Sequence, residues 1–261
     1  MLSPCKMTVS YDGRAYLGWQ RHGKKPTVQY AIEEAIKKAF AVGSQVTGSG
    51  RTDRGVHASG QVAGVELPDS LTPEDIKSQL NRALPTDIRI LHVSRAPDGF
   101  DACRSAVAKH YRYLIWNKMA LPDDRDGRVW HVKRPLDAQA MIAACSIFEG
   151  KHDFASFVTR PNFKQKSTVR TVFKMAVNSE EPVIVIDIWA DGFLYKMVRN
   201  IVRALVKVGE GRYDHERLHF IFAAKDRAAA PGTAPASGLY LEHVYYSDDE
   251  LFQDIGKKDP A

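Results

Sequence analysis

Two patterns of apolar spacing alternate along the first hundred residues of the chain. Runs in which every second residue is apolar predict four β-strands, at about 5–10, 45–50, 60–67 and 88–95. Two other segments repeat apolar residues every three or four positions and predict amphipathic helices, at about 27–41 and 73–84. The predicted order is strand, helix, strand, strand, helix, strand, which is the order of a ferredoxin-like domain.

Polar residues indicate where each of these helices begins. Thr27 is a natural N-cap of the first helix, because its side-chain oxygen can accept a hydrogen bond from a backbone N–H of the first turn. Thr72 can cap the second helix in the same way, Pro73 suits its first turn, and Asp75 completes an acidic capping box. We therefore expect the helix starts to be fixed more closely than the strand ends.

The same order of elements recurs in the second half, after an irregular passage at about 96–107. Strands are predicted at about 109–117, 169–177, 183–190 and 239–246. Helices are predicted near 137–148 and 196–208, with an extra one at about 214–224 and a flexible segment from Ala228 to Gly238 before the last strand. We expect an α+β protein with mostly antiparallel sheets, built from two ferredoxin-like halves, 1–104 and 105–261.

A glycine-rich turn with several charges joins the second and third predicted strands. It reads GSGRTDRGVHASGQVA and places Asp53 between Arg51 and Arg54, with His57 close behind. Neighbouring cations favour the ionised form of an acid, so we expect Asp53 to act as a nucleophile or charge stabiliser rather than as a proton donor. A solvated turn is the alternative interpretation of such a loop.

Composition and charge narrow the classes of partner. The 261 residues include 37 Lys and Arg against 31 Asp and Glu, and the net charge of +6 favours a polyanion partner. No window approaches about 18 unbroken apolar residues and no secretion signal is evident, so we expect a cytoplasmic protein that does not enter membranes. The three cysteines and nine histidines lack the spacing of metal ligands, so no metal is predicted.

Two elements of the second half carry basic or aromatic residues in register. The helix at 196–208 repeats cations on one face, which favours phosphate contact or a solvated face, at Lys196, Arg199, Arg203 and Lys207. On the strand at 109–117, Tyr111 and Tyr113 share one face, while His110 and Arg112 share the other. This tyrosine pair suits cross-strand packing or stacking on an unpaired base.

The order and spacing of several motifs resemble the TruA-type tRNA pseudouridine synthases over nearly the whole chain. The pattern YDGxxYxGWQ appears at Tyr11–Gln20, GRTDxGVHAxGQV at Gly50–Val62, and an RxYxY-like pattern at Lys109–Tyr113. Further matches are Asp153-Phe154 with Ser156-Phe157, Arg170-Thr171-Val172, Met197-Val198-Arg199-Asn200, Ala224-Lys225-Asp226-Arg227 and Gly238-Leu239-Tyr240-Leu241. By themselves, residues 11–20 read as a turn in which Trp19 anchors the core.

The resemblance implies the isomerisation of uridine to pseudouridine at nucleotides 38, 39 and 40 of the tRNA anticodon stem-loop. It implies a homodimer and a target base that flips into a basic, RNA-binding cleft between the two halves. Asp53 falls on the family's catalytic aspartate. Tyr111 would lie against the base and serve in proton removal, and Arg199 would pair with Asp53 and help to open the stem.

The remaining roles are less specific. Arg51 and Arg54 would contact phosphate or shape the loop, and Arg51 is also a candidate for the flipping role. The reaction needs no cofactor, because no electrons leave the substrate. Asp53 could add to the base or assist at the sugar, and the sequence is compatible with both routes.

One motif departs from the family pattern, and two rival functions stay open. Cys103 stands where the family has an arginine, and the neighbouring Arg104 would point the other way on a regular strand, which puts an RNA contact in doubt. The rivals are a tandem RNA-binding module without catalysis and a nucleoside hydrolase that would need a second acid or base near Asp53, for which Asp12 is the nearest candidate. The tail at 247–261 receives no role.

Overall fold

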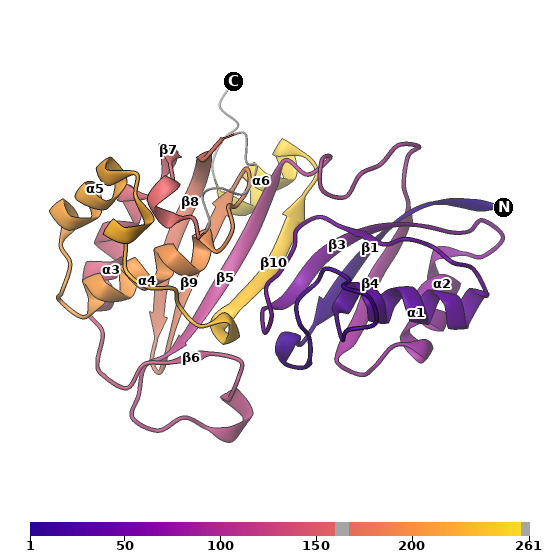
Figure 1. The fold of residues 1–261 in the computed structure, drawn as a ribbon, viewed down its shortest axis with the longest axis horizontal. Helices are drawn as coiled ribbons and strands as arrows, with labels where there is room; N and C mark the ends of the chain where they lie inside the picture. Colours follow the sequence, from indigo (N-terminus) through magenta and orange to yellow (C-terminus); the bar gives the residue numbers. More distant parts are fainter. Residues whose placement is uncertain (160–166, 257–261) are drawn as a thin grey trace. The chain divides into compact units, whose positions relative to one another are not determined.

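The chain forms two compact units in a computed structural model that describes residues 1–159 and 167–256 (Figure 1). One unit contains residues 1–107 and the returning chain from Tyr240 onward, and the other contains residues 108–239. Each unit has its own strands and helices, so each is described separately.

The sheet of the first unit is organised around β3 (His57–Pro68) and β1 (Leu2–Tyr11). Strand β1 pairs with β3 along one edge and with β4 (Ile88–Arg95) along the other, and both pairings are antiparallel. The second edge of β3 pairs with the short β2 (Thr47–Gly48), antiparallel, and with β10 (Leu239–Tyr245), which runs parallel to it. Two segments far apart in the sequence therefore flank the same strand.

Helices α1 (Val28–Phe40) and α2 (Pro73–Ala83) pack against each other, and α2 also packs against β4. Both predicted caps are confirmed, because the side chains of Thr27 and Thr72 accept hydrogen bonds from the backbone N–H groups of residues 30 and 75. The buried stripes of the two helices are fully enclosed, at Ile32, Ile36, Ile76 and Leu80.

The sheet of the second unit is antiparallel throughout its main strands. The strands lie side by side in the order β5 (Ala108–Trp116), β9 (Val183–Ala190), β8 (Val169–Glu180) and β7 (Gly150–Asp153). A two-residue strand, β6 (Trp130–His131), runs parallel to the end of β5. The helices and the mostly antiparallel strands thus form a mixed α+β fold, as predicted.

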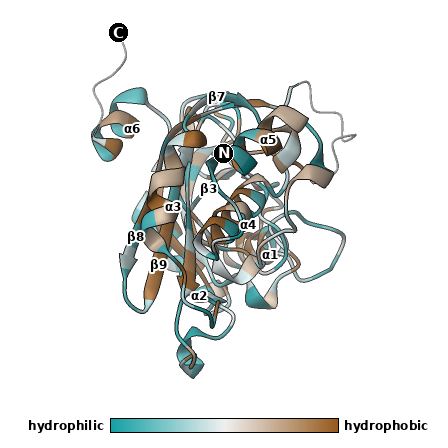
Figure 2. Ribbon diagram, turned by 90° about the vertical axis from the view of Figure 1, so that its left-hand side faces the viewer, coloured by the Kyte–Doolittle hydropathy of each residue, from teal (hydrophilic) through white to brown (hydrophobic). Residues whose placement is uncertain are grey.

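Three helices belong to this second unit: α3 (Ala138–Ala144), α4 (Met197–Gly209) and α5 (His215–Ala224). Helices α3 and α4 pack together, and the apolar residues of α4 are buried, as the brown segments of α4 and β9 illustrate (Figure 2). None of the helices in the described part of the chain is long and apolar enough to cross a membrane.

All eight predicted strands and five predicted helices are present, with ends that shift by about three residues at most in the long strands. Among the strands and α-helices of the described residues, β6, β7 and α6 (Asp248–Ile255) were not predicted. The predicted helix at 137–148 is a shorter α3 followed by a 3-10 turn at Cys145–Ile147. Residues 248–255 of the tail, to which the sequence assigned no role, form α6, which Ser247 caps.

Several contacts hold residues 228–238, the segment for which the sequence predicts flexibility. Two short 3-10 turns occupy this segment, at Arg227–Ala229 and Ala236–Gly238. Side chains elsewhere in the unit also bind its backbone: the hydroxyl of Tyr113 donates to the carbonyl of Pro235 at 2.8 Å, and Nε of Arg199 donates to that of Ala234 at 2.8 Å. These hydrogen bonds therefore hold a segment whose composition by itself is typical of a loop.

Candidate active site

Asp53 lies in the loop 49–56 that joins β2 to β3 in the first unit, as predicted. Its side chain is partly exposed, whereas Arg51 and Arg54 are exposed. The backbone N–H of Val56 donates to the carbonyl of Asp53 at 3.1 Å and closes a tight turn, and Gly55 within it has φ of 78°. A glycine is required there because a side chain disfavours this left-handed conformation.

A buried glutamine supports the loop from below. The Gln61 side chain accepts a hydrogen bond from the N–H of Gly50 at 3.3 Å and donates one to its carbonyl at 2.7 Å. Gln61 is fully buried, and the N–H of Ser49 donates to the carbonyl of Val62 at 2.8 Å. The start of the loop is therefore bound to β3 through both backbone and side chain.

The residue before Asp53 is fixed by the segment that contains the YDGxxYxGWQ pattern. The hydroxyl groups of Tyr11 and Thr52 form a buried hydrogen bond of 2.8 Å. Burial raises the pKa of Tyr11 to about 12, so the phenol stays neutral. The N–H of Trp19 donates to the carbonyl of Thr52 at 3.1 Å, and Trp19 is itself buried, as predicted for a core anchor.

Two glycines of the same segment press against the loop on both sides of Asp53. A Cβ placed on Gly13 would lie 2.0 Å from the carbonyl oxygen of Val56, which is far inside van der Waals contact. A Cβ on Gly18, whose φ is +96°, would lie 2.5 Å from the carbonyl oxygen of Thr52. The backbone of residues 13–18 therefore encloses the loop at a distance that no larger residue permits.

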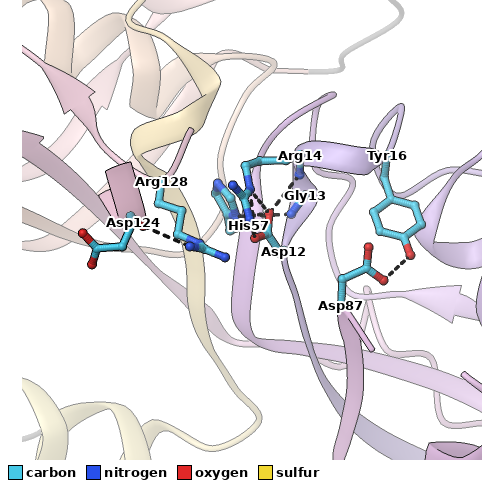
Figure 3. A network of polar contacts seen from close by, with 8 residues as sticks. All are labelled: Asp12, Gly13, Arg14, Tyr16, His57, Asp87, Asp124 and Arg128. Carbon is cyan, nitrogen blue, oxygen red and sulfur yellow. Dashed lines mark hydrogen bonds and ion pairs between the residues drawn. The ribbon is translucent and has the colours of Figure 1, made fainter. Parts of the chain in front are cut away.

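Asp12 is held as a structural carboxylate (Figure 3). Arg14 donates to it from its backbone N–H at 3.1 Å, from Nε at 3.0 Å and from Nη2 at 2.7 Å. Burial opposes ionisation of Asp12, but these hydrogen bonds outweigh it and hold its pKa at about 2. A group with this pKa is ionised at neutral pH, so of the two roles that the hydrolase alternative left open for Asp12, this pKa disfavours the acid and leaves the base open.

The alternation predicted for β5 is confirmed within the second unit. His110 Nε2 and Arg112 Nε both contact Oδ1 of Asp187, at 2.7 Å and 2.8 Å, on one face of the strand. On the other face, Tyr111 is buried with its ring edge-on to Phe193, 4.9 Å between centroids. Tyr113 is fully buried, and burial raises the pKa of its hydroxyl strongly. Tyr113 therefore has a packing role.

Helix α4 does not present a purely solvated row of cations. The guanidinium of Arg203 lies over the ring of Trp130, with 5.2 Å from Cζ to the centroid, and Lys207 pairs with Glu210 at 2.6 Å. Arg199 binds the carbonyl of Ala234 through Nε. The sign pattern in the sequence could not reveal these partners, because they come from distant segments or from the turn after the helix.

A buried asparagine next to Arg199 joins three segments of the second unit. Asn200 donates from Nδ2 to the carbonyl of Phe157 at 2.6 Å, and its Oδ1 accepts hydrogen bonds from Arg227 at 3.2 Å and Thr233 at 2.7 Å. Burial lowers the pKa of Arg227 below its usual value. The sequence matches at Arg199-Asn200 and Asp226-Arg227 thus lie in one hydrogen-bonded cluster.

Cys103 and Arg104 lie in a turn and not on a strand. The carboxylate of Asp101 accepts the N–H groups of Cys103 at 2.8 Å and Arg104 at 2.9 Å, and both side chains are exposed. The strand alternation on which the expectation for Arg104 depended therefore does not apply to these residues.

Sequence reasoning identified the loop but missed the residues that fix it. It brought Arg51, Asp53 and Arg54 together correctly, whereas Tyr111 and Arg199 belong to the other unit. It overlooked the roles of Tyr11, Gly13, Gly18, Thr52 and His57. Among the described residues, no group of His, Cys, Asp and Glu side chains is arranged to hold a metal ion.

Comparisons with known proteins show the family to which the chain belongs. A family model described as tRNA pseudouridine synthase matches residues 7–104 and 144–247. The segments include Asp53 and Arg199, and Tyr111 lies between them.

Curated relatives match the chain over nearly its whole length. A tRNA pseudouridine synthase A of Methylacidiphilum infernorum is 44% identical over 94% of this chain and 96% of its own length. The protein of that name from Rhodospirillum rubrum is 40% identical over 92% of this chain and 87% of its own length. A tRNA pseudouridine synthase A 2 of Clostridium perfringens is 40% identical over 92% of this chain and 98% of its own length. The chain belongs to the tRNA pseudouridine synthase family.

Proposed function

We propose that this enzyme isomerises uridine to pseudouridine at nucleotides 38, 39 and 40 of the tRNA anticodon stem-loop, with Asp53 as the catalytic carboxylate. The observation that carries the proposal is the construction of the Asp53 loop. Hydrogen bonds and two glycine contacts fix its backbone immediately before and after the acid, while the carboxylate stays partly exposed. Such preorganisation is what a reacting group requires.

The chemistry needs one ionised acid and no redox partner. The N1–C1′ bond breaks, the uracil rotates, C5 bonds to C1′, and the proton on C5 is lost, so that substrate and product are isomers. Asp53 would either add to the base or stabilise the cationic sugar while the base is detached. Both roles use an ionised carboxylate, and the loop geometry supports them equally.

The target uridine must leave its stack to reach Asp53, and we propose that it flips into a basic cleft. Extrusion costs a few kcal/mol, which phosphate contacts offset. The net charge of +6 and the exposed positions of Arg51 and Arg54 support such contacts. We propose Tyr111 and Arg199 as further substrate-binding residues, on the resemblance of their motifs to the family pattern.

The finer architecture is also a proposal. The strand order β4–β1–β3–β2 in the first unit supports a ferredoxin-like half at residues 1–104, and the order β5–β9–β8 supports a second at 105–261. We further propose a cytoplasmic homodimer, on the family resemblance. Equilibrium sedimentation tests the dimer, which a single monomeric species would exclude.

Tritium release is the experiment that tests the proposed reaction. Purified protein is incubated with unmodified tRNA carrying tritium at C5 of uridine, because formation of the C5–C1′ bond sends that tritium to water. We expect release together with pseudouridine at nucleotides 38 to 40, mapped by carbodiimide adducts that stop reverse transcription. Binding without release would support the rival RNA-binding module, and free uracil would support a hydrolase.

A further inference from the structure

His57 is a buried side chain that the proposed reaction does not use. It is the first residue of β3, four positions after Asp53, and only 2% of it is exposed. A buried imidazole needs hydrogen-bond partners for its ring nitrogens, and those partners decide where the ring proton resides. One partner of His57, the N–H of Gly13, comes from the glycine segment that encloses the Asp53 loop.

The ring edge of His57 is held by a backbone N–H. The N–H of Gly13 donates to Nδ1 at 3.2 Å (Figure 3). Nδ1 can accept this hydrogen bond only in the neutral tautomer that carries the ring proton on Nε2. The ring face stacks on Tyr240, with centroids 4.6 Å apart and planes at 16°, because residues 57 and 240 are partners in the β3–β10 pairing.

Asp12 is close enough to compete for the same ring nitrogen. Its Oδ1 lies 3.4 Å from Nδ1 of His57. However, Arg14 already supplies this carboxylate with hydrogen bonds from its backbone and its guanidinium. The hydrogen bonds of Arg14 contribute more than His57 to the lowered pKa of Asp12, and the proposal below takes the tautomer in which Nδ1 accepts the Gly13 N–H.

Gly13 connects this hydrogen bond to the catalytic loop. Its N–H holds His57, while its backbone lies so close to the carbonyl of Val56 that a Cβ would stand 2.0 Å from the oxygen. Val56 in turn donates its N–H to the carbonyl of Asp53. Gly13 thus contacts both Val56, the last residue of the turn that begins at Asp53, and His57, the strand residue that follows this turn.

We propose that His57 is a positioning residue that holds the Asp53 loop in place by accepting the Gly13 N–H on Nδ1. The proposal rests on the proposed function, because the position of Asp53 matters for that reaction. It assigns the imidazole no proton transfer. Its essential property is an acceptor atom at the Nδ1 position, with the ring held between Gly13 and Tyr240.

Two amide substitutions separate the acceptor from the other properties of the ring. In His57→Asn the side-chain oxygen can occupy the place of Nδ1, whereas in His57→Gln the amide reaches the place of Nε2 and leaves Gly13 without an acceptor. We expect kcat for tritium release to stay within ~5-fold of the parent for His57→Asn. For His57→Gln and His57→Ala we expect a fall of ~100-fold, the consequence of a displacement of about 1 Å.

Binding and stability distinguish positioning from a general structural role. The Kd for tRNA and the KM should stay near the parent values in all three variants, because His57 does not face the substrate in this proposal. Thermal unfolding of the Asn and Gln variants is compared directly, since both lose the aromatic ring. Equal losses of kcat in these two variants, or full activity of His57→Gln, would overturn the proposal.

The tautomer is measured without reference to activity. In the ¹⁵N NMR spectrum of the full chain labelled at histidine, the His57 signals are those that disappear in His57→Asn. We expect an unprotonated Nδ1 and a protonated Nε2. A proton on Nδ1 would contradict the proposal even if the enzyme is active. A parent protein that carries the proton on Nε2, as expected, but releases no tritium would refute the proposed function alone.

Discussion

Replacing Gly13 with alanine adds a single methyl group at the tightest contact of the Asp53 loop. The new Cβ would lie 2.0 Å from the carbonyl oxygen of Val56 and 2.6 Å from its carbonyl carbon. Ordinary contacts of a Cβ atom are 3.4–4 Å, so the two backbones must separate by at least about 1 Å. Because both atoms belong to backbone, no side-chain rotation can relieve the collision.

The displaced segment begins at Asp53, so the change should appear in the chemical step. A misplacement of about 1 Å costs ~100-fold in rate when a reacting group is held in a near-attack geometry. We expect Gly13→Ala to lower kcat for tritium release by that factor. We expect the Kd for tRNA to change little, since the exposed cations of the loop stay in place.

Gly43→Ala is the matched control. Gly43 belongs to the same unit, and a Cβ there would meet nothing within 4 Å. Single-turnover rates and tRNA affinities are measured for both variants beside the parent, with thermal unfolding to show that each is folded. A folded Gly13→Ala protein with the same rate as Gly43→Ala would refute the claim that this contact fixes Asp53.

Three further predictions concern other parts of the structure. Because the pKa of Asp12 is about 2 when folded and 3.8 when unfolded, its contribution is complete above pH 3.8 and is lost as the pH falls towards 2. After solvent screening, the contribution of Asp12 to the free energy of unfolding is about 1 kcal/mol. In chemical denaturation, this free energy should therefore fall more steeply with decreasing pH for the parent than for Asp12→Asn. Asn200→Ala removes the hydrogen bonds to the Phe157 carbonyl and the Thr233 hydroxyl. It should lower the free energy of unfolding by about 2 kcal/mol in denaturant titrations, and a loss below about 0.5 kcal/mol would contradict this. Arg54→Ala should weaken tRNA binding and reduce the slope of log K against log salt by about 1, whereas an unchanged slope would exclude a phosphate contact.

Much of the fold could be predicted from the sequence because local rules dominate there. The caps at Thr27 and Thr72 and the apolar stripes of α1 and α4 depend on residues a few positions apart. The strands β6 and β7 are only two and four residues long, too short to show alternation. Helix α6 was missed although Ser247 precedes an acidic first turn, a signal that could have identified it.

The site was predictable only where its residues are adjacent in the chain. The sequence GRTDRG shows an acid between two cations, but nothing in it indicates that the Tyr11 hydroxyl binds Thr52 or that Gly13 contacts Val56. Those contacts join segments about forty residues apart. The glycine spacing within YDGRAYLGWQ was the available signal, because glycines at 13 and 18 suggest a backbone that approaches another closely.

The most direct test of the central claim is a single-turnover comparison of the parent protein with Asp53→Asn on tRNA labelled with tritium at C5 of uridine. The substitution keeps the size of the side chain and removes its charge, so the Kd for tRNA should be unchanged. We expect the rate of tritium release to fall by at least ~10⁴-fold, as for the loss of a group that reacts with the substrate. An Asp53→Asn protein that releases tritium at a rate close to the parent's would contradict the assignment of Asp53 as the catalytic carboxylate.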